Sequence, residues 1–143
     1  MTIAGIMTKN VRTVGCEEPI AAAARLLKRE NIGCLPVCSD RGKLVGILTD
    51  RDIALRCVAA GLDPAHTKVQ DIMTRGVYTL SPENTAETAT ETMRKAGVHR
   101  LPVVEKGALC GILSLSDLVG KTSLYAETME TLTDLAGNIR HRT

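Results

Sequence analysis

Aromatic side chains are almost missing from this chain. It has no Trp and no Phe, and its two Tyr are Tyr78 and Tyr125. Proteins that bind single-stranded nucleic acid stack bases on aromatic side chains, so the composition disfavours that function. The formal net charge is +2 with both signs interspersed, which provides no basic surface for a phosphate backbone. Nucleic-acid binding is therefore not expected.

Long apolar runs are absent as well. No stretch approaches the roughly 20 residues that a transmembrane helix needs, and the first residues lack the basic-then-apolar pattern of a signal peptide. We therefore expect no membrane partner and a cytoplasmic protein. Hydrophobic residues still make up 44% of the 143 residues, which is enough for one compact core, formed as one domain or as two interlocked halves.

Catalytic motifs and a disulfide framework are also missing. The sequence has no Gly-x-Ser-x-Gly motif, no paired-histidine metal motif and no P-loop, so we do not expect an enzyme. The five cysteines have an odd count and irregular spacing. Cys34 and Cys38 fall on a predicted strand, where four residues span about 13 Å, so they cannot share a zinc ion without a bend. Buried thiols are the favoured interpretation, and no metal site is predicted.

The chain does have an internal repeat. Three motifs occur twice, 66 or 65 residues apart and in the same order: Ile-Met-Thr at 6–8 and 72–74, Leu-Pro-Val at 35–37 and 101–103, and Gly-Ile-Leu-(Thr/Ser)-x-x-Asp at 46–52 and 111–117. Two copies of one unit therefore share the chain. Each copy ends on the same polar pattern after a buried strand, which indicates two related binding sites.

Hydrophobic patterning predicts the order β-α-β-β-α in each copy, and therefore an α/β (α+β) fold of tandem repeats. The expected elements of the first copy are strand 11–14, a helix with Ile20, Ala23, Ala24 and Leu27 on one face, strands 35–38 and 44–48, and helix 50–60. Those of the second copy are strand 77–80, a helix with Ala86, Ala89, Thr90 and Met93 on one face, strands 101–104 and 109–113, and helix 115–121. Pro36 and Pro102 lack a backbone N–H, so each should lie on an edge strand or at an unpaired position.

The repeats divide the chain into four parts. We expect repeat 1 at 1–61, a linker at 62–71, repeat 2 at 72–121 and a C-terminal helical tail at 122–143. An apolar stripe at helical spacing marks the tail: Leu124, Met129, Leu132, Leu135 and Ile139. We expect this helix to pack on its own domain or on a second copy of the chain.

The polar residues that end each copy are the candidate site. Thr49 closes a strand, and a carboxylate one turn into the next helix, Asp52, can accept two hydrogen bonds from a vicinal diol such as that of ribose. The second copy provides Ser114, Ser116 and Asp117 at the same place. The alternative is that Thr49 and Ser114 cap helices and that the aspartates are favourable first-turn charges. We expect both carboxylates to be at least partly exposed.

These motifs resemble the cystathionine-β-synthase (CBS) domain pair, or Bateman module, over about residues 6 to 119. The first half is similar to small stand-alone bacterial CBS-pair proteins. The second half, through Val98-His99-Arg100-Leu101 and residues 111–117, resembles the γ regulatory subunit of AMP-activated protein kinase. The resemblance implies pseudo-two-fold symmetry, a homodimer, and an output that passes through this dimer or through an unidentified effector protein.

The resemblance also implies a non-catalytic regulatory module with two clefts between the copies. Such clefts bind adenosine-containing ligands: AMP, ADP or ATP, with NAD(H) or S-adenosylmethionine as further candidates. The residues carried over for one cleft are Ile47, Thr49, Asp52, Val77, Tyr78 and Arg100. Those for the other are Ile112, Ser114, Ser116, Asp117, Val11, Arg12, Gly33 and Cys34. Asp would bind ribose hydroxyls, Thr or Ser the phosphate or ribose, and the extended segments would enclose adenine.

The two clefts are predicted to differ in charge. Arg100 can bind a phosphate through its guanidinium, whereas the aligned Cys34 has no charge. His99, a further phosphate ligand, aligns with Gly33, but its ring can turn toward the Asp117 cleft and reduce the difference, and so can an inward-pointing Arg12. We therefore expect the Asp52 cleft to prefer phosphorylated ligands more strongly. Two alternatives remain open, namely a structural dimerisation module with empty clefts and a cysteine-based metal or redox sensor.

Overall fold

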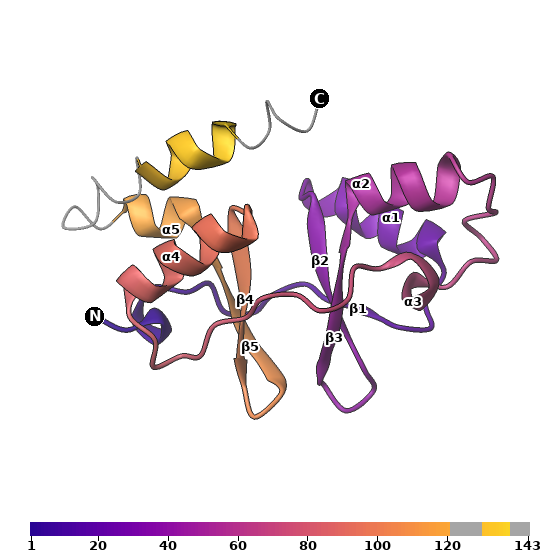
Figure 1. Ribbon diagram of the computed structural model, residues 1–143. Helices are drawn as coiled ribbons and strands as arrows, with labels where there is room; N and C mark the ends of the chain where they lie inside the picture. The colour runs from indigo at the N-terminus through magenta and orange to yellow at the C-terminus, as the bar shows by residue number, and fades with distance from the viewer. Residues whose placement is uncertain (121–129, 138–143) are drawn as a thin grey trace. The chain divides into compact units, whose positions relative to one another are not determined.

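The computed structural model describes residues 1–120 and 130–137, which belong to two compact units (Figure 1). Unit 2 is the continuous segment Arg12–Val77. Unit 1 combines Met1–Val11 with the part of the chain that starts at Tyr78. Unit 1 is therefore assembled from both ends of the chain, whereas unit 2 uses consecutive residues.

Unit 2 packs one amphipathic helix on a three-stranded sheet. Its elements are β1 (Val14–Gly15), α1 (Ile20–Glu30), β2 (Cys34–Cys38), β3 (Leu44–Thr49), α2 (Asp50–Asp52), the π-helix η2 (Ile53–Val58) and α3 (Val69–Ile72). Strand β2 lies in the middle, parallel to β1 and antiparallel to β3. Three α1 residues at helical spacing, Ile20, Ala23 and Leu27, are buried in the core together with sheet side chains, as the pattern predicts.

Unit 1 repeats this plan with a smaller sheet. Its elements are the 3-10 turn η1 (Ile3–Gly5), α4 (Ala86–Ala96), β4 (Arg100–Glu105), β5 (Ala108–Ser114), α5 (Leu115–Val119) and a helix over residues 130–137. Strands β4 and β5 form an antiparallel hairpin. The predicted strand 77–80 is reduced to one parallel bridge between Leu80 and Val103. The predicted buried face of α4 is confirmed, and Thr85 caps this helix by accepting a hydrogen bond from the Thr88 N–H.

The opening motif of each copy lies in the unit that contains the hairpin of the other copy. Thr8 exchanges two backbone hydrogen bonds with Ile112, of 2.8 and 3.0 Å, within unit 1. Thr74 does the same with Ile47, at 2.8 and 2.9 Å, within unit 2. The compact units therefore divide the chain at other places than the sequence repeats 1–61 and 72–121.

A glycine permits each of these contacts. A Cβ atom on Gly46 would lie 2.7 Å from the carbonyl oxygen of Thr74 and 2.8 Å from the sulfur of Met73. On Gly111 it would lie 2.9 Å from the Thr8 carbonyl oxygen and 2.6 Å from the Met7 sulfur. These distances are shorter than van der Waals contact, so a side chain at either glycine would clash with the Ile-Met-Thr segment. The Gly-Ile-Leu and Ile-Met-Thr motifs therefore occur together because one packs on the backbone of the other.

Some predicted elements differ from the observed ones. Of the two alternatives predicted for Pro36, the edge strand is wrong, because β2 is a central strand, and the unpaired position is confirmed, because Pro36 and Ile47 form no hydrogen bond with each other. Pro36 is tolerated there because its partner Ile47 directs its own N–H and carbonyl groups to Thr74 instead. The predicted helix 50–60 forms as α2 and η2 and ends at Val58. In the tail, Leu135 is buried and Leu132 is exposed, while Leu124, Met129 and Ile139 lie outside the described residues.

Candidate functional site

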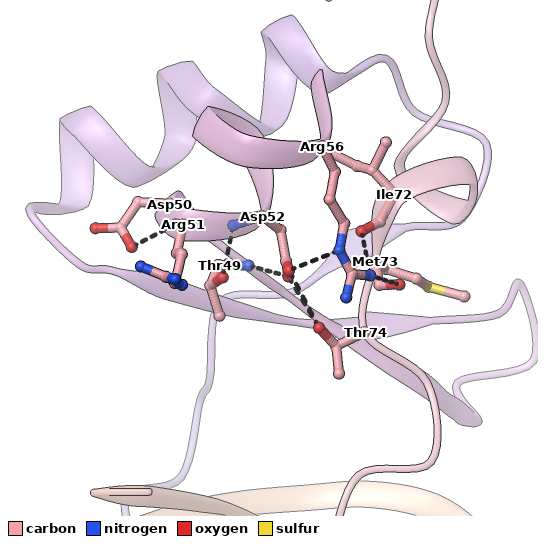
Figure 2. A network of polar contacts seen from close by, with 8 residues as sticks. All are labelled: Thr49, Asp50, Arg51, Asp52, Arg56, Ile72, Met73 and Thr74. Carbon is pink, nitrogen blue, oxygen red and sulfur yellow. Dashed lines mark hydrogen bonds and ion pairs between the residues drawn. The ribbon is translucent and has the colours of Figure 1, made fainter. Parts of the chain in front are cut away.

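The strand-to-helix corner of unit 2 carries a reciprocal cap. The Thr49 hydroxyl accepts a hydrogen bond from the Asp52 N–H at 3.0 Å, and the Asp52 carboxylate accepts one from the Thr49 N–H, also at 3.0 Å (Figure 2). This capping box satisfies two backbone donors that a helix start otherwise leaves unpaired. The capping alternative is therefore correct as a description of the local structure.

Asp52 has further partners, and they bury it. The Thr74 hydroxyl lies 3.2 Å from each carboxylate oxygen, and the Arg56 Nε lies 3.7 Å from Oδ1. Asp52 is only 7% exposed, so the expectation that both aspartates are at least partly exposed is wrong for this one. The reason is the Ile-Met-Thr segment, whose threonine and backbone close over the carboxylate.

Arg56 extends this network to the backbone. Its Nη1 donates to the carbonyl oxygens of Ile72 and Met73, at 3.3 Å each (Figure 2). One guanidinium thus joins the Asp52 carboxylate to the motif that packs on Gly46. We conclude that the Asp52 corner of unit 2 has a structural role, because the Asp52 carboxylate oxygens already accept hydrogen bonds from residues of the same unit.

The corner of unit 1 has the same cap, with fewer partners among residues 1–120 and 130–137. The Ser114 N–H donates to the Asp117 carboxylate at 2.8 Å, and the Asp117 N–H donates to the Ser114 hydroxyl at 3.2 Å. The Ser114 and Ser116 hydroxyls share a hydrogen bond of 2.8 Å. Among residues 1–120 and 130–137, no arginine contacts Asp117 as Arg56 contacts Asp52, and Asp117 is half-buried. The expected partial exposure is confirmed here.

A pocket of about 300 Å³ opens beside this second corner. It is lined by His99, Arg100, Ser114, Leu115, Ser116, Val119 and Leu132. Arg100 lies opposite Ser114 in the β4–β5 register, and the His99 carbonyl accepts a 2.7 Å hydrogen bond from the Leu115 N–H. Strand pairing thus brings two potential cations next to two hydroxyls. The family resemblance assigned Arg100 to the Asp52 cleft. The structure adds that Arg100 lies next to Ser114 within unit 1.

The equivalent place in unit 2 has different chemistry. Cys34 lies opposite Thr49 in the sheet, and the Gly33 carbonyl accepts from the Asp50 N–H at 3.0 Å. A Cβ on Gly33 would lie 3.4 Å from the Asp50 carboxylate. An acidic side chain therefore stands where unit 1 has Leu115. This corner is less favourable for an anion than the corner of unit 1.

The remaining predicted site residues are distributed over the two units. Arg12 forms an exposed ion pair with Glu30, with 3.4 Å between Nε and Oε1. Four of the others are half-buried, Val77 and Ile47 in unit 2 and Val11 and Ile112 in unit 1. The aromatic ring of Tyr78 belongs to unit 1 and is exposed.

Sequence reasoning missed Thr74 and Arg56 at the Asp52 corner, and it missed three residues that line the pocket of unit 1: Leu115, Val119 and Leu132. Thr74 lies in a repeated motif, so its recurrence was an available signal. Arg56 follows Asp52 by four residues, the spacing of a helical ion pair. Leu132 belongs to the predicted tail helix, and no pattern in the sequence connects it with the pocket.

Of the five cysteines, Cys57 is buried and the other four are half-buried. Burial raises the pKa of Cys38 above its ordinary value, and the nearby Cys16 adds to this. Burial, together with the charges of Glu105 and Glu83, also raises the pKa of Cys110. In the part of the chain that the structure describes, no group of three or more His, Cys, Asp or Glu side chains is placed to hold a metal ion.

The family model for the CBS domain matches twice, at residues 3–58 and 69–123. The chain belongs to the CBS domain family. The CBS domain-containing protein YhcV of Bacillus subtilis is 41% identical over 112 residues, which cover 78% of this chain and 79% of YhcV. Hypoxic response protein 1 of Mycobacterium tuberculosis is 34% identical over 117 residues, 82% of either chain.

Solved structures of CBS proteins confirm the fold. The structure of hypoxic response protein I with two coordinated zinc ions gives a TM-score of 0.79 at 33% identity, covering 85% of this chain and 98% of that one. The hexameric CBS-CP12 protein from bloom-forming cyanobacteria gives 0.73 at 29% identity, over 88% and 73% of the two chains. This CBS pair is thus a module of a generally regulatory, non-catalytic kind. Among its described helices, none is long and apolar enough to cross a membrane.

Proposed function

We propose that this CBS pair is a ligand-sensing module that binds adenosine-containing ligands. AMP, ADP and ATP are the first candidates, and NAD(H) and S-adenosylmethionine are the others. The pocket beside Asp117 is the observation that carries the proposal, because it combines cationic, hydroxyl and apolar side chains in one place. Such a mixture fits a phosphorylated nucleoside better than a purely apolar or purely ionic ligand.

Each part of the ligand has a chemically suitable partner there. Arg100 and His99 suit a phosphate, since a guanidinium forms charge-assisted bonds to phosphate oxygens. The Asp117 carboxylate suits the ribose hydroxyls, because it is half-buried and keeps acceptor capacity. Val119 and Leu132 offer apolar surface to a base. We therefore place the stronger site at Asp117, the reverse of the sequence-based order.

The internal contacts of the Asp52 carboxylate favour a second candidate function. This carboxylate is buried and bonded to Thr49, Thr74 and Arg56, so binding ribose there would require breaking internal contacts. The unit 2 corner then acts as a structural element. A dimerisation module is the corresponding function, and exposed apolar side chains on and after η2 support it: Leu55, Val58 and Leu62. We expect a homodimer, and sedimentation that detects only a 15.3 kDa species at tens of micromolar would contradict it.

Thermal shift and calorimetry test the sensing function. A ligand at 100 times its dissociation constant adds about 2.7 kcal/mol to the free energy of unfolding. For a chain of this size, that corresponds to roughly 5–10 °C in melting temperature. The screen contains AMP, ADP, ATP, NAD(H), S-adenosylmethionine and, as a control, GMP. If no adenosine compound at millimolar concentration shifts the melting temperature or produces heat, the module does not sense these ligands.

A further inference from the structure

The helix over residues 130–137 is attached to α4 through Arg94. The guanidinium Nε lies 2.9 Å from the Asp134 carboxylate, an ion-pair contact without hydrogen-bond alignment. Nη2 lies 3.4 Å from the Thr131 hydroxyl and 3.8 Å from the Glu130 carboxylate. Nη1 is held in turn by Glu91, one turn earlier on α4, at 3.0 Å. One arginine therefore contacts three residues of the terminal helix.

An apolar contact completes the attachment. Leu135 is 2% exposed and belongs to the hydrophobic core of unit 1. Thr131 is fully buried on the same helix. In Figure 1 this helix, drawn in yellow, lies beside α4 and α5. The helix is thus a packed part of unit 1, although the CBS family model ends at residue 123.

The exposed side of this helix borders the pocket. Leu132 lines the pocket together with Val119 of α5. The two side chains are 37% and 39% exposed, so each keeps apolar surface that a ligand can cover. His99, Arg100 and Ser116 provide the polar part of the lining. The pocket therefore has an apolar wall, and part of this wall comes from outside the CBS domain.

We propose that helix 130–137 completes the ligand site of unit 1. The flat apolar part of an amphipathic anion, such as the base of a nucleotide, packs on Leu132, and Arg94 holds the helix in position for this contact. The nucleotide as ligand rests on the proposed function, whereas the role of the helix does not follow from CBS membership. Because binding and helix attachment favour each other, a ligand that covers Leu132 also strengthens the attachment.

Calorimetry on Leu132→Ser tests the wall. The probes are AMP and inorganic pyrophosphate, which carries negative charge but no apolar surface. We expect AMP to bind about fivefold to tenfold more weakly, since the variant loses most of the apolar area that the base covers. Pyrophosphate affinity should remain unchanged. The control is Ile32→Ser, which changes an equally exposed apolar residue of unit 2, outside the proposed dimerisation surface, and should bind both probes as the unmodified chain does.

Amide hydrogen exchange on Arg94→Gln tests the attachment without any ligand. We expect peptides from residues 130–137 to exchange at least about tenfold faster, with Arg94→Lys intermediate. Arg25→Gln on α1, an exposed arginine of unit 2, is the matched control and should leave this exchange unchanged. AMP should slow the exchange of 130–137 in the unmodified chain but not in Leu132→Ser.

The outcomes separate this inference from the proposed function. If the unmodified chain and Ile32→Ser bind no adenosine compound, the proposed function fails and the base contact fails with it. If both bind AMP and Leu132→Ser binds it equally well, only the role of the helix is refuted. Equal weakening of AMP and pyrophosphate by Leu132→Ser also refutes it, because the leucine would then act through the fold. Unchanged exchange in Arg94→Gln refutes the attachment.

Discussion

The corners at Asp52 and Asp117 share a sequence pattern and a capping box, but their surroundings differ. Asp52 is buried, and its carboxylate is bonded to Thr74 and Arg56. Asp117 is half-buried, and its capping partner Ser114 and its neighbour Ser116 line the pocket of unit 1. The comparison teaches that a duplicated residue can have different roles in its two copies. In unit 2 the aspartate is held by contacts within the unit, whereas in unit 1 the contacts of the aspartate among the described residues are those of its cap.

The largest effect that tests this comparison is on stability. We expect Asp52→Ala to lower the free energy of unfolding by about 2–4 kcal/mol, because the half-buried donors of Thr49 and Thr74 lose a charged, buried acceptor. Asp117→Ala should cost only about 1 kcal/mol, the usual value for a lost helix cap. Urea unfolding of both variants measures the difference. Equal losses would mean that the two corners are energetically alike and that the contrast described above is wrong.

Gly46 and Gly111 test a feature that both units share, the close packing of an Ile-Met-Thr motif on the hairpin. Gly46→Ala and Gly111→Ala should each cost roughly 1–3 kcal/mol, because the new methyl group would lie within 3 Å of a backbone carbonyl oxygen. Gly5→Ala is the matched control, since nothing lies within 4 Å of its Cβ position. Thermal unfolding compares the three. A neutral Gly111→Ala beside a destabilising Gly46→Ala would show that the opening motif packs closely in unit 2 alone.

Arg56 allows a finer test of the unit 2 corner. Its guanidinium is half-exposed, so its ion pair with Asp52 is partly screened by solvent. We expect Arg56→Gln to lower the free energy of unfolding by about 1 kcal/mol, mainly through its hydrogen bonds to the backbone carbonyls of Ile72 and Met73. Arg51→Gln, on the exposed side of the same corner, should change stability by less than about 0.5 kcal/mol. Urea unfolding in low and high salt compares the two variants. Equal losses in the free energy of unfolding would contradict the structural role of Arg56.

The thiols give the smallest expected effect, and both units share it. The folded chain raises the pKa values of Cys38 and Cys110, so folding favours their protonated forms. This contribution is complete below the ordinary thiol pKa of 9.0 and is lost as the pH rises through the raised values. Stability should therefore fall above about pH 9, and less steeply in Cys38→Ser. The measurement is urea unfolding between pH 7 and about pH 10.5, and an unchanged slope in that variant would contradict the prediction.

Local patterns predicted the fold well and the site only in part. The duplicated motifs and the small residues at helical spacing led to the helices, the hairpins and the two capping residues. The burial of Asp52 was not predictable in this way, because it depends on Thr74, 22 residues away. Repetition shows that two segments are alike but not which hairpin each one joins. Leu132 was missed for a related reason, since the position of the tail helix depends on its ion pairs with Arg94.

Each Ile-Met-Thr motif pairs with the hairpin of the other copy, and this pairing also affects the order in which the chain folds during synthesis. In unit 2, Ile47 meets Thr74 after 27 further residues, so this unit is complete when its segment has been made. In unit 1, Thr8 must wait for Ile112, 104 residues later. Closing the longer loop costs more conformational entropy, and contacts distant in sequence form slowly. We therefore expect the segment around Thr8 to reach its final place late and to be able to pair with the wrong strand edge while the ribosome still holds the chain.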